Sequence, residues 1–187
     1  MGSKRDIATY RFQKEDACFF DTNVWLNIYG PQGAPDDPVV RTYSTALSRI
    51  LKAESNIHVD VLVLSEFANR YARLEFDIRN VDHLYWNFKA FRKSQDFIGV
   101  AQAIADALRR ILKIAIPIES GFSHVNLLGL INQLETDPCD FNDLVITALC
   151  VSNNFLLVTH DSDFASENVS ILTANPTLQR SSSQSAP

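Results

Sequence analysis

Five acidic residues occupy positions where a carboxylate could take part in chemistry. Asp21 directly follows the apolar stretch 17–20, and both Asp161 and Asp163 follow the apolar stretch 155–160. Asp143 opens an apolar helical stretch, and Glu66 lies shortly after another apolar stretch. Carboxylates gathered in one place repel one another and raise their own pKa values. A hard divalent cation relieves that repulsion, so the pattern predicts a Mg²⁺ or Mn²⁺ site with oxygen ligands.

Taken singly, each of these positions has a simpler explanation. Asp21 and Asp143 fit helix N-caps or partners of a helix dipole, and capping is the favoured interpretation of either one alone. Glu66 fits an exposed ion pair with Arg70 or Arg73 on the same helix. Turn formation accounts for either aspartate after residue 160. Caps and turns do not explain why these carboxylates all stand close to a strand end or to the start of a helix.

Short apolar stretches alternate with stretches of helical periodicity along the chain. Strands are predicted at residues 17–20, 57–61, 114–119, 155–160 and 169–172. Helices are predicted at residues 22–29, 39–53, 64–78, 82–93, 97–113, 123–135 (with Ser123 as its N-cap) and 144–151. This alternation predicts an α/β fold, a three-layer α/β/α sandwich around a central, mainly parallel sheet. Ligands of such sheets bind beyond the carboxyl ends of the strands, so the carboxylates should converge there.

The folded domain is predicted to span residues 17–175. Residues 1–16 form an N-terminal extension, and residues 176–187 form a serine-rich tail with too little apolar content to become ordered. Residues 30–38, "GPQGAPDDP", are predicted to be an irregular loop because glycine and proline dominate them.

The composition is that of a globular protein with one domain of ordinary size. Of the 187 residues, 46% are hydrophobic and 21% are charged. The sequence has no apolar run of membrane-spanning length and no signal-peptide pattern, so we expect a cytoplasmic protein without a membrane contact. Cys18, Cys139 and Cys150 lack the spacing of a zinc site and are expected to be reduced thiols.

The formal net charge of −5 argues against broad, nonspecific clamping of a nucleic acid but permits a local basic patch. The segment "HLYWNFKAFRK", residues 83–93, interleaves aromatic residues with cations, a pattern that could stack bases. The alternative, favoured for the aromatic residues, is that Leu84, Phe88 and Phe91 form a core or dimer face. The candidates for contacts with RNA phosphates are Arg70, Arg73, Lys89, Arg92 and Lys93.

Four segments resemble, in order and spacing, the acidic motifs of PIN-domain ribonucleases. They are "FFDTNVWL", "LSEF", "NDLVITA" and "LLVTHDSDF", and the resemblance extends from Ala17 to Asn175. Within that family the arrangement is most similar to the VapC-type toxins of toxin–antitoxin pairs. The resemblance implies a parallel sheet flanked by helices, Mg²⁺-dependent cleavage of RNA, a small antitoxin partner and a homodimer.

Matched position by position, the resemblance also implies roles for individual residues. Asp21, Glu66 and Asp143 match the three core carboxylates, and Asp161 matches the fourth, with Asp163 as its neighbouring alternative. The implied metal ligands are Asp21, Asp143, Asp161 and Asp163, and the implied supporting residues are Asn23 and Thr159. The loop at 30–38 and the helical stretch at 78–113 are longer than in compact toxins of this type, which leaves the substrate class and the partner open.

Two other functions are compatible with parts of the pattern. A PIN-like module could bind RNA or a protein without cleaving it, although such a domain would normally have lost a carboxylate. A haloacid-dehalogenase-like phosphatase also begins with an aspartate at a strand end. That family needs a second aspartate two residues later, where this chain has Asn23.

Overall fold

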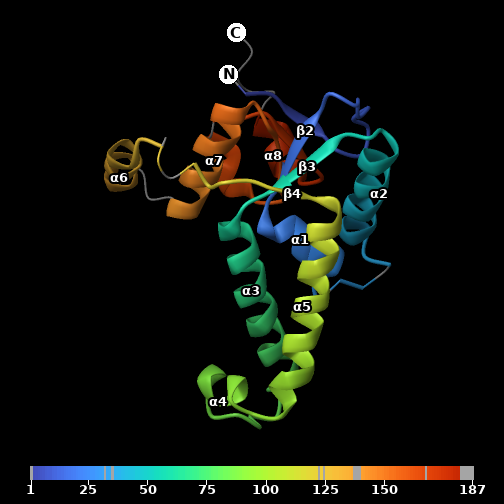
Figure 1. Ribbon diagram of the computed structural model, residues 1–187, viewed down its shortest axis with the longest axis vertical. Coiled ribbons are helices and arrows are strands. Elements are labelled where there is room, and N and C mark those ends of the chain that lie inside the picture. The colour runs from blue at the N-terminus through green and yellow to red at the C-terminus, as the bar shows by residue number, and fades with distance from the viewer. Residues whose placement is uncertain are drawn as a thin grey trace.

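A single parallel sheet organises the chain in the computed structural model (Figure 1). The structure describes residues 2–31, 33–34, 36–121, 123, 125–136, 140–166 and 168–181. Six strands lie in the order β1-β6-β5-β2-β3-β4, and each neighbouring pair is parallel. They are β1 (Lys4–Asp6), β2 (Ala17–Phe20), β3 (Asn56–Val59), β4 (Ile116–Pro117), β5 (Leu156–Val158) and β6 (Ile171–Thr173).

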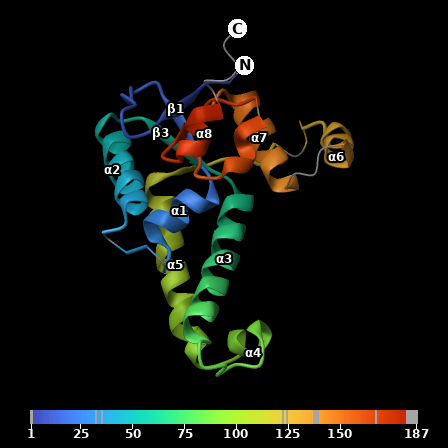
Figure 2. The ribbon, with the colours of Figure 1, turned by 180° about the vertical axis from the view of Figure 1, so that it is seen from behind.

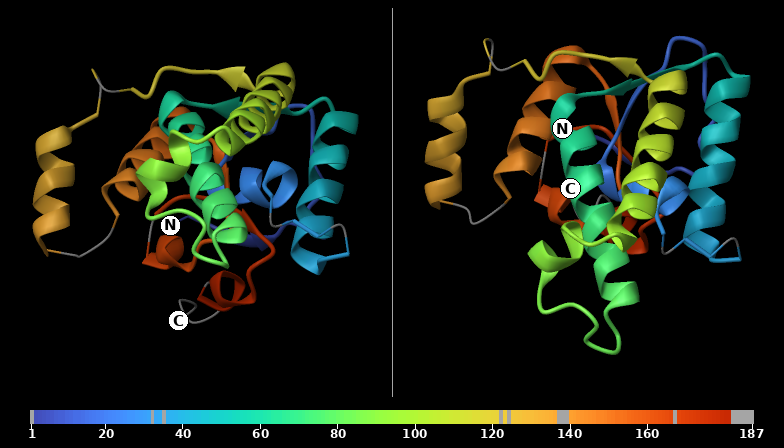
Figure 3. Two further views of the ribbon diagram at one scale, coloured as in Figure 1. Left: turned by 90° about the horizontal axis from the view of Figure 1, so that it is seen from below. Right: turned by 60° about the horizontal axis from the view of Figure 1, so that its bottom comes forward.

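Helices flank the sheet in the three-layer α/β/α arrangement that the sequence predicts (Figures 1 and 3). They are α1 (Thr22–Tyr29), α2 (Pro38–Lys52), α3 (Val61–Arg79), α4 (Phe88–Arg92), α5 (Asp96–Ile114), α6 (Leu127–Thr136), α7 (Phe141–Asn153) and α8 (Pro176–Ser181), with a 3-10 helix η1 (Ser162–Ser166). Helix α2 packs against β3, α7 against β5, and α8 against β1 and β6.

The strand order reverses between β2 and β5. From β2 the chain adds β3 and then β4 on one side, and it afterwards crosses back to place β5 and β6 on the other side. In parallel α/β sheets the crevice at such a reversal is the usual place for a ligand. The residues that follow β2 and β5 therefore occupy the most favourable position for a site.

The two central strands are buried on both faces, which explains their continuous apolar sequences. Cys18, Phe19 and Phe20 of β2 are fully buried, as are Leu157 and Val158 of β5. Cys18 is a free thiol, as is the buried Cys150, whereas Cys139 lies outside the described residues. Within the described part of the chain, no helix combines the length and the apolar character needed to cross a bilayer.

Helices α3 and α5 project from the sheet as a long arm with α4 at its far end (Figures 1 and 2). Helix α5 buries Val100, Ile104 and Ile111, which recur at helical spacing along one face. Helix α3 buries Phe67 and Tyr71 and packs against α5. The arm thus continues the hydrophobic core away from the sheet.

The predicted helix at 82–93 is wrong over most of its length, because only Phe88–Arg92 is helical. Asparagine side chains explain the difference, since they offer the backbone hydrogen bonds that compete with a helix. The side chain of Asn80 accepts from the N–H of Tyr85 at 2.7 Å, and that of Asn87 accepts from the N–H of Ala90 at 2.9 Å. His83 adopts a left-handed conformation with φ 52°, which also excludes a continuous helix.

The predicted N-terminal extension and C-terminal tail both contribute to the fold. Residues Lys4–Asp6 form an edge strand paired with β6, and Ile7 behind them is fully buried. Residues Pro176–Ser181 form α8, and the side chain of Leu178 is fully buried. The buried Leu178 and hydrogen bonds from Thr177 and Gln179 to residues 173–175 hold this segment in place although its average composition is polar, while residues 182–187 lie outside the described part.

Other element boundaries differ by a few residues from the prediction. Helix α6 begins at Leu127, and Asn126 replaces Ser123 in the capping role because its side chain accepts from the N–H of Gly129 at 3.0 Å. Helix α7 extends further at both ends than residues 144–151, from a cap at Asp140 to a left-handed Asn154. The segment between α1 and α2 is a loop in its described residues, as predicted.

Replacement of Leu178 by alanine should show that α8 is part of the cooperative fold. Because the side chain is fully buried, we expect the free energy of unfolding to fall by about 2–5 kcal/mol. Urea denaturation measures this change. Leu128→Ala is the matched control, because Leu128 is 74% exposed on another helix and should change stability by no more than about 0.5 kcal/mol. Equal, small effects of the two changes would show that α8 is only loosely attached.

Candidate active site

Asp21 lies at the reversal point of the sheet, between the end of β2 and the start of α1. Its side chain is buried, and one carboxylate oxygen accepts from the N–H of Thr22 at 2.6 Å, which caps the helix. The other oxygen accepts from the side-chain amide of Asn23 at 2.5 Å and from the hydroxyl of Thr159 at 2.8 Å. Capping therefore uses one oxygen only, and the whole carboxylate is fixed in direction.

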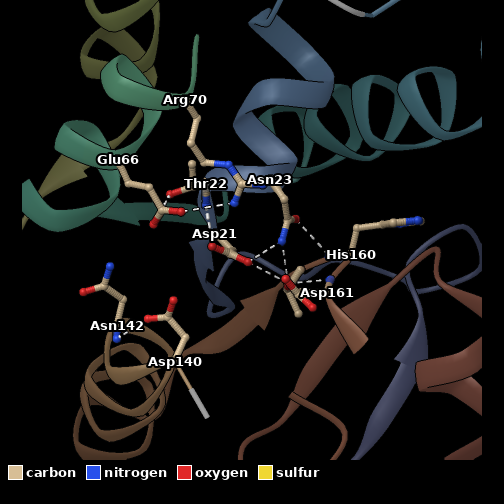
Figure 4. A network of polar contacts seen from close by, with 10 residues as sticks. Asp21, Thr22, Asn23, Glu66, Arg70, Asp140, Asn142, His160 and Asp161 are labelled. Atoms are coloured by element: carbon tan, nitrogen blue, oxygen red, sulfur yellow. Dashed lines mark hydrogen bonds and ion pairs between the residues drawn. The ribbon is translucent and has the colours of Figure 1, made fainter. Parts of the chain in front are cut away.

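A frame of hydrogen bonds ties the start of α1 to the residues after β5 (Figure 4). The amide of Asn23 donates to the Thr159 hydroxyl oxygen at 3.1 Å and accepts from the N–H of His160 at 3.0 Å. The same hydroxyl oxygen accepts from the N–H of Asp161 at 3.0 Å. Asn23 and Thr159, predicted to support the site, both lie directly beside Asp21.

Tyr43 of α2 extends this frame to β6. Its fully buried hydroxyl lies 3.0 Å from the carbonyl oxygen of Thr159 and 3.0 Å from Nδ1 of His160, and it accepts from the N–H of Ala174 at 3.1 Å. The hydroxyl thus holds the ends of two neighbouring strands in register. Sequence reasoning missed Tyr43, because it lies in a helix far along the chain from all its partners.

Glu66 faces the site from α3. Its two carboxylate oxygens accept from the hydroxyl of Thr22 and from the guanidinium of Arg70, both at 3.2 Å. The predicted ion pair with Arg70 therefore exists, but it coexists with a contact to the residue after Asp21. Because α3 begins at Val61, Glu66 stands in the second turn of that helix, whereas the predicted helix at 64–78 would place it in the first turn.

Asp143 lies in the first turn of α7, but it does not cap that helix. The cap is Asp140, whose side chain accepts from the N–H of Asn142 at 2.8 Å. Among the described residues the carboxylate of Asp143 has no hydrogen bond and no ion pair. The capping explanation thus fails for Asp143, and its carboxylate is available to a ligand.

The four core carboxylates act on one another electrostatically. Burial is the main cause that raises the pKa of Asp143 to about 7, and the charges of Asp21, Asp140, Asp161 and Glu66 raise it further. Burial likewise raises the pKa of Asp21 to about 6 against the effect of its hydrogen bonds, and Glu66 and Asp161 add to the shift. Side chains from four separate elements therefore share one negative environment.

The structure distinguishes Asp161 from Asp163. Asp161 follows β5 directly, and its carboxylate accepts from the N–H of Asp163 at 3.1 Å. Asp163 is exposed on η1, and the largest charge effects on the pKa values of Asp21 and Asp143 come from Asp161 and other carboxylates, not from Asp163. Of the two predicted alternatives, Asp161 is the one that the fold brings to the other carboxylates.

Two further aspartates near the site escaped the sequence prediction. Asp60 follows β3 and caps α3 through a 2.9 Å contact with the N–H of Val63, while its Oδ2 is buried without a hydrogen-bond partner. The charge of Asp140 helps to raise the pKa of Asp143. Figure 4 shows the side chain of Asp140 in the same region as those of Asp21 and Glu66. The strand-end rule would have found Asp60 if the predicted strand at 57–61 had ended two residues earlier.

The donor set suits a hard cation, because it consists of carboxylate, hydroxyl and amide oxygens. Among the described residues, no three carboxylate, imidazole or thiolate groups stand close enough to enclose a metal ion as the side chains lie. A closed cage is not required for Mg²⁺, which keeps several waters and is usually bound by one or two carboxylates. The residues present therefore fit an open, partly hydrated site around Asp21 and Asp143.

The predicted RNA-binding cations are divided between two places. Arg70 lies beside Glu66 at the site (Figure 4). Arg73 lies further along α3, with its guanidinium 4.6 Å from the ring centre of Phe88. Lys89 and Arg92 belong to α4 and Lys93 follows it, at the far end of the arm (Figure 2). Only Arg70 is therefore placed to contact a phosphate held at the carboxylates.

Comparison with known proteins identifies the family. Residues 18–167 match the family model of the PIN domain. The chain belongs to the PIN domain family. Its fold is similar to a chain in a structure described as "Crystal structure of VapBC2 from Rickettsia felis bound to a DNA fragment from their promoter". The TM-score is 0.54 at 16% identity, over 84% of this chain and 98% of that chain. No curated protein matches the sequence significantly.

The metal-free PIN domain should lose stability as the pH rises through the raised pKa values of Asp21 and Asp143. Between about pH 4, where an ordinary aspartate ionises, and the folded-state values of about 6 and about 7, the folded state holds protons that the unfolded chain has released. The free energy of unfolding must therefore fall with rising pH over that window. Asp143→Asn cannot ionise, so the variant should gain stability relative to the parent protein as the pH increases.

Thermal unfolding in the presence of a chelator, from about pH 4 to about pH 8, measures this effect. The difference in Tm between Asp143→Asn and the parent should grow in favour of the variant over this range. Asp163→Asn makes the same change in charge at an exposed position and serves as the control. A Tm difference for Asp143→Asn that stays constant with pH would contradict the electrostatic coupling.

Proposed function

We propose that this PIN domain is a Mg²⁺- or Mn²⁺-dependent endoribonuclease that hydrolyses phosphodiester bonds of RNA. The observation that carries the proposal is the gathering of Asp21, Glu66, Asp143 and Asp161 at the edge where β2 and β5 end, close enough that burial together with the charges of the other three raises the pKa of Asp143. A protein gains nothing in stability from like charges gathered at one edge, so their presence is best explained by a cationic cofactor. Membership of the PIN domain family supports this reaction class.

Asp21, Asp143 and Asp161 would hold the metal in this proposal, directly or through its retained waters, because no three carboxylates enclose an ion as the described side chains lie. Such a cation supplies Lewis-acid charge for the hydrolysis of a phosphodiester. Asp21 is fixed by three hydrogen bonds and gives the site a rigid reference point. The carboxylate of Asp143 has no hydrogen bond among the described residues and can therefore adjust to the ligand.

Glu66 and Arg70 would act on the substrate and on the attacking water. The contact with Thr22 aims one oxygen of Glu66 towards the residues beside Asp21, where that oxygen can orient a water and accept its proton. Arg70 is about half exposed. Its guanidinium offers several N–H donors in a planar fork, so it can pair with a phosphate oxygen while it stays near Glu66.

The protein should cleave single-stranded RNA in the presence of Mg²⁺ and lose this activity when a chelator is added. Asp21→Asn should lower the cleavage rate by about a hundred-fold or more, because it removes the central charge of the site. Gel analysis of a labelled RNA measures the cleavage, and circular dichroism verifies that the variant is folded. Undiminished cleavage by Asp21→Asn, or no metal-dependent cleavage by the parent protein, would refute the proposal in favour of a non-cleaving binding module.

A matched pair of substitutions tests the assignment of the fourth carboxylate. Asp161→Asn should lower the rate of cleavage by about ten-fold or more, whereas Asp163→Asn should leave it unchanged within about two-fold, because an exposed charge is screened by solvent. The reverse order of effects would assign the role to Asp163.

We also propose that the protein is the toxin of a toxin–antitoxin pair, with a small antitoxin protein as its partner, and that it acts as a homodimer in the cytoplasm. Two observations support the proposal. The four acidic motifs resemble those of VapC-type toxins, and the fold is similar to a chain of the VapBC2 structure.

Expression in bacterial cells should arrest growth, and the arrest should disappear with Asp21→Asn. Co-expression of a small reading frame next to the gene should restore growth, because an antitoxin masks the site of its toxin. Growth curves of the three strains measure the effect. Normal growth on expression of an active nuclease would favour a housekeeping role.

A further inference from the structure

The arm tip, residues 80–93, exposes the indole of Trp86, whereas the rings of Tyr85, Phe88 and Phe91 are covered in part or completely. Phe91 is fully buried and Phe88 is half-buried, and both rings pack against Phe76 of α3 with centroid distances of 5.7 Å. This packing agrees with the core interpretation of these two aromatic residues. Trp86, by contrast, is 93% exposed, and Leu84, which the sequence groups with the core, is 68% exposed. Among the residues that the structure describes, the indole of Trp86 makes no ring or cation contact.

The backbone on both sides of Trp86 is held in place. Before it, Tyr85 donates its backbone N–H to the side chain of Asn80 and its hydroxyl to the carboxylate of Asp96. The ring of Tyr85 also meets Phe91 edge to face at a centroid distance of 5.0 Å. After it, Asn87 caps α4. Trp86 is thus presented to solvent from an anchored segment, which lowers the entropy lost when a ligand stacks on it.

The charged residues that follow Trp86 up to residue 93 are all cationic, whereas Asp82 and Asp96 are the acidic residues of the neighbouring segments. Helix α4 and the residue that follows it carry Lys89, Arg92 and Lys93 and no acidic residue. None of these three cations takes part in an ion pair among the described residues. The guanidinium of Arg92 lies 5.9 Å from the ring centre of Phe88 and 5.8 Å from that of Phe97, so its position is defined.

A groove continues this positive surface along α5. It has a volume of about 680 Å³ and is lined by Arg92 and Lys93 at one end and by Arg109 at the other. Arg109 is partly neutralised by Asp106 at 2.6 Å, so the basic end of the groove is the one at the tip. The groove offers a path for an anionic chain that leaves the tip.

We propose that the arm tip is a binding site for single-stranded RNA, in which a base stacks on Trp86 while backbone phosphates contact Lys89, Arg92 and Lys93. The inference rests on the proposed ribonuclease function and deepens it. It means that the substrate carries an unpaired stretch that engages the arm, apart from the bond that is cut. Stacking on an aromatic ring needs a base that is free of a helix, which specifies the single-stranded form.

Charge complementarity favours RNA over a protein as the occupant. A protein interface at the tip would have to desolvate the three cations of α4 and its C-cap, which have no ion pair among the described residues, and this is unfavourable unless the partner supplies matching carboxylates. A single RNA strand supplies flat bases and phosphates together at a regular spacing. The net charge of −5 on the whole chain would confine such a strand to the few basic surfaces.

Substitutions at Trp86 test the stacking contact. The probe is a short, fluorescently labelled single-stranded oligoribonucleotide of mixed sequence, and fluorescence anisotropy in a chelator measures its dissociation constant without cleavage. Trp86→Leu keeps an apolar side chain but removes the ring, and it should weaken binding by about 5- to 150-fold, the range for loss of one stacked base. Trp86→Phe keeps a ring and should stay close to the parent affinity. A duplex of the same sequence should respond to neither change.

Substitutions of the lysines test the phosphate contacts. Lys89→Gln and Lys93→Gln should each lower the slope of log affinity against log salt concentration by about 0.7, the value for one phosphate contact on a single strand. Lys52→Gln makes the same change in charge on the exposed end of α2 and should leave the slope unchanged.

Equal affinity of Trp86→Leu and the parent protein, no binding of the single strand by the parent, or unchanged salt slopes would each overturn the inference. A loss of self-association in Trp86→Leu at unchanged RNA affinity, seen by analytical ultracentrifugation, would overturn it in favour of a protein-binding surface. RNA affinity is measured without metal, so it can be interpreted even if the protein shows no cleavage activity. Failure of the ribonuclease proposal and failure of this inference are therefore separable.

Discussion

Repulsion between carboxylates is the physical constraint on which the site depends. Parallel strands end at one edge of the sheet, so residues that follow different strands are brought together whatever their separation in the sequence. At this edge the residues are acidic, and burial removes the water that would otherwise screen them. The folded chain therefore holds an electrostatic strain that a cation can release, and the strain is spread over β2, α3, α7 and the residues after β5.

The site combines a rigid half with an adaptable half. On the rigid side, Asn23 and Thr159 lock Asp21 in place, and Tyr43 joins that frame to two strand ends. On the other side, Asp143 stands at the start of a helix, and its carboxylate has no hydrogen bond among the described residues. A carboxylate that is held in place, such as that of Asp21, defines the position of a bound cation. A carboxylate that is free to move, such as that of Asp143, can adjust when the coordination of the cation changes.

Local sequence patterns were sufficient to predict the strands that end at the site, the α/β/α layers and the convergence of Asp21, Asp143 and Asp161. The strand-end rule needs only an apolar stretch and the residue after it. Tyr43 could not be predicted in this way, because its role depends on contacts with residues more than a hundred positions away. The strand Lys4–Asp6 was missed because its three residues are charged and show no periodicity, and it forms only through pairing with β6. The loop before α4 depends on two asparagine side chains, which outweigh the helical spacing of the nearby apolar residues.

The pairing of β1 with β6, and the packing of α8 against β1, also affect how the chain can fold. These contacts join the two ends of the sequence, so almost the entire polypeptide must be arranged before they can form. Contacts of such long range are slow to form, because the entropy of closing the intervening loop is lost before any interaction compensates for it. The edge of the sheet at β1 should therefore be the last part to assemble and the first to open. The reversal point between β2 and β5 lies in the interior of the sheet, so opening of the β1 edge does not disturb it.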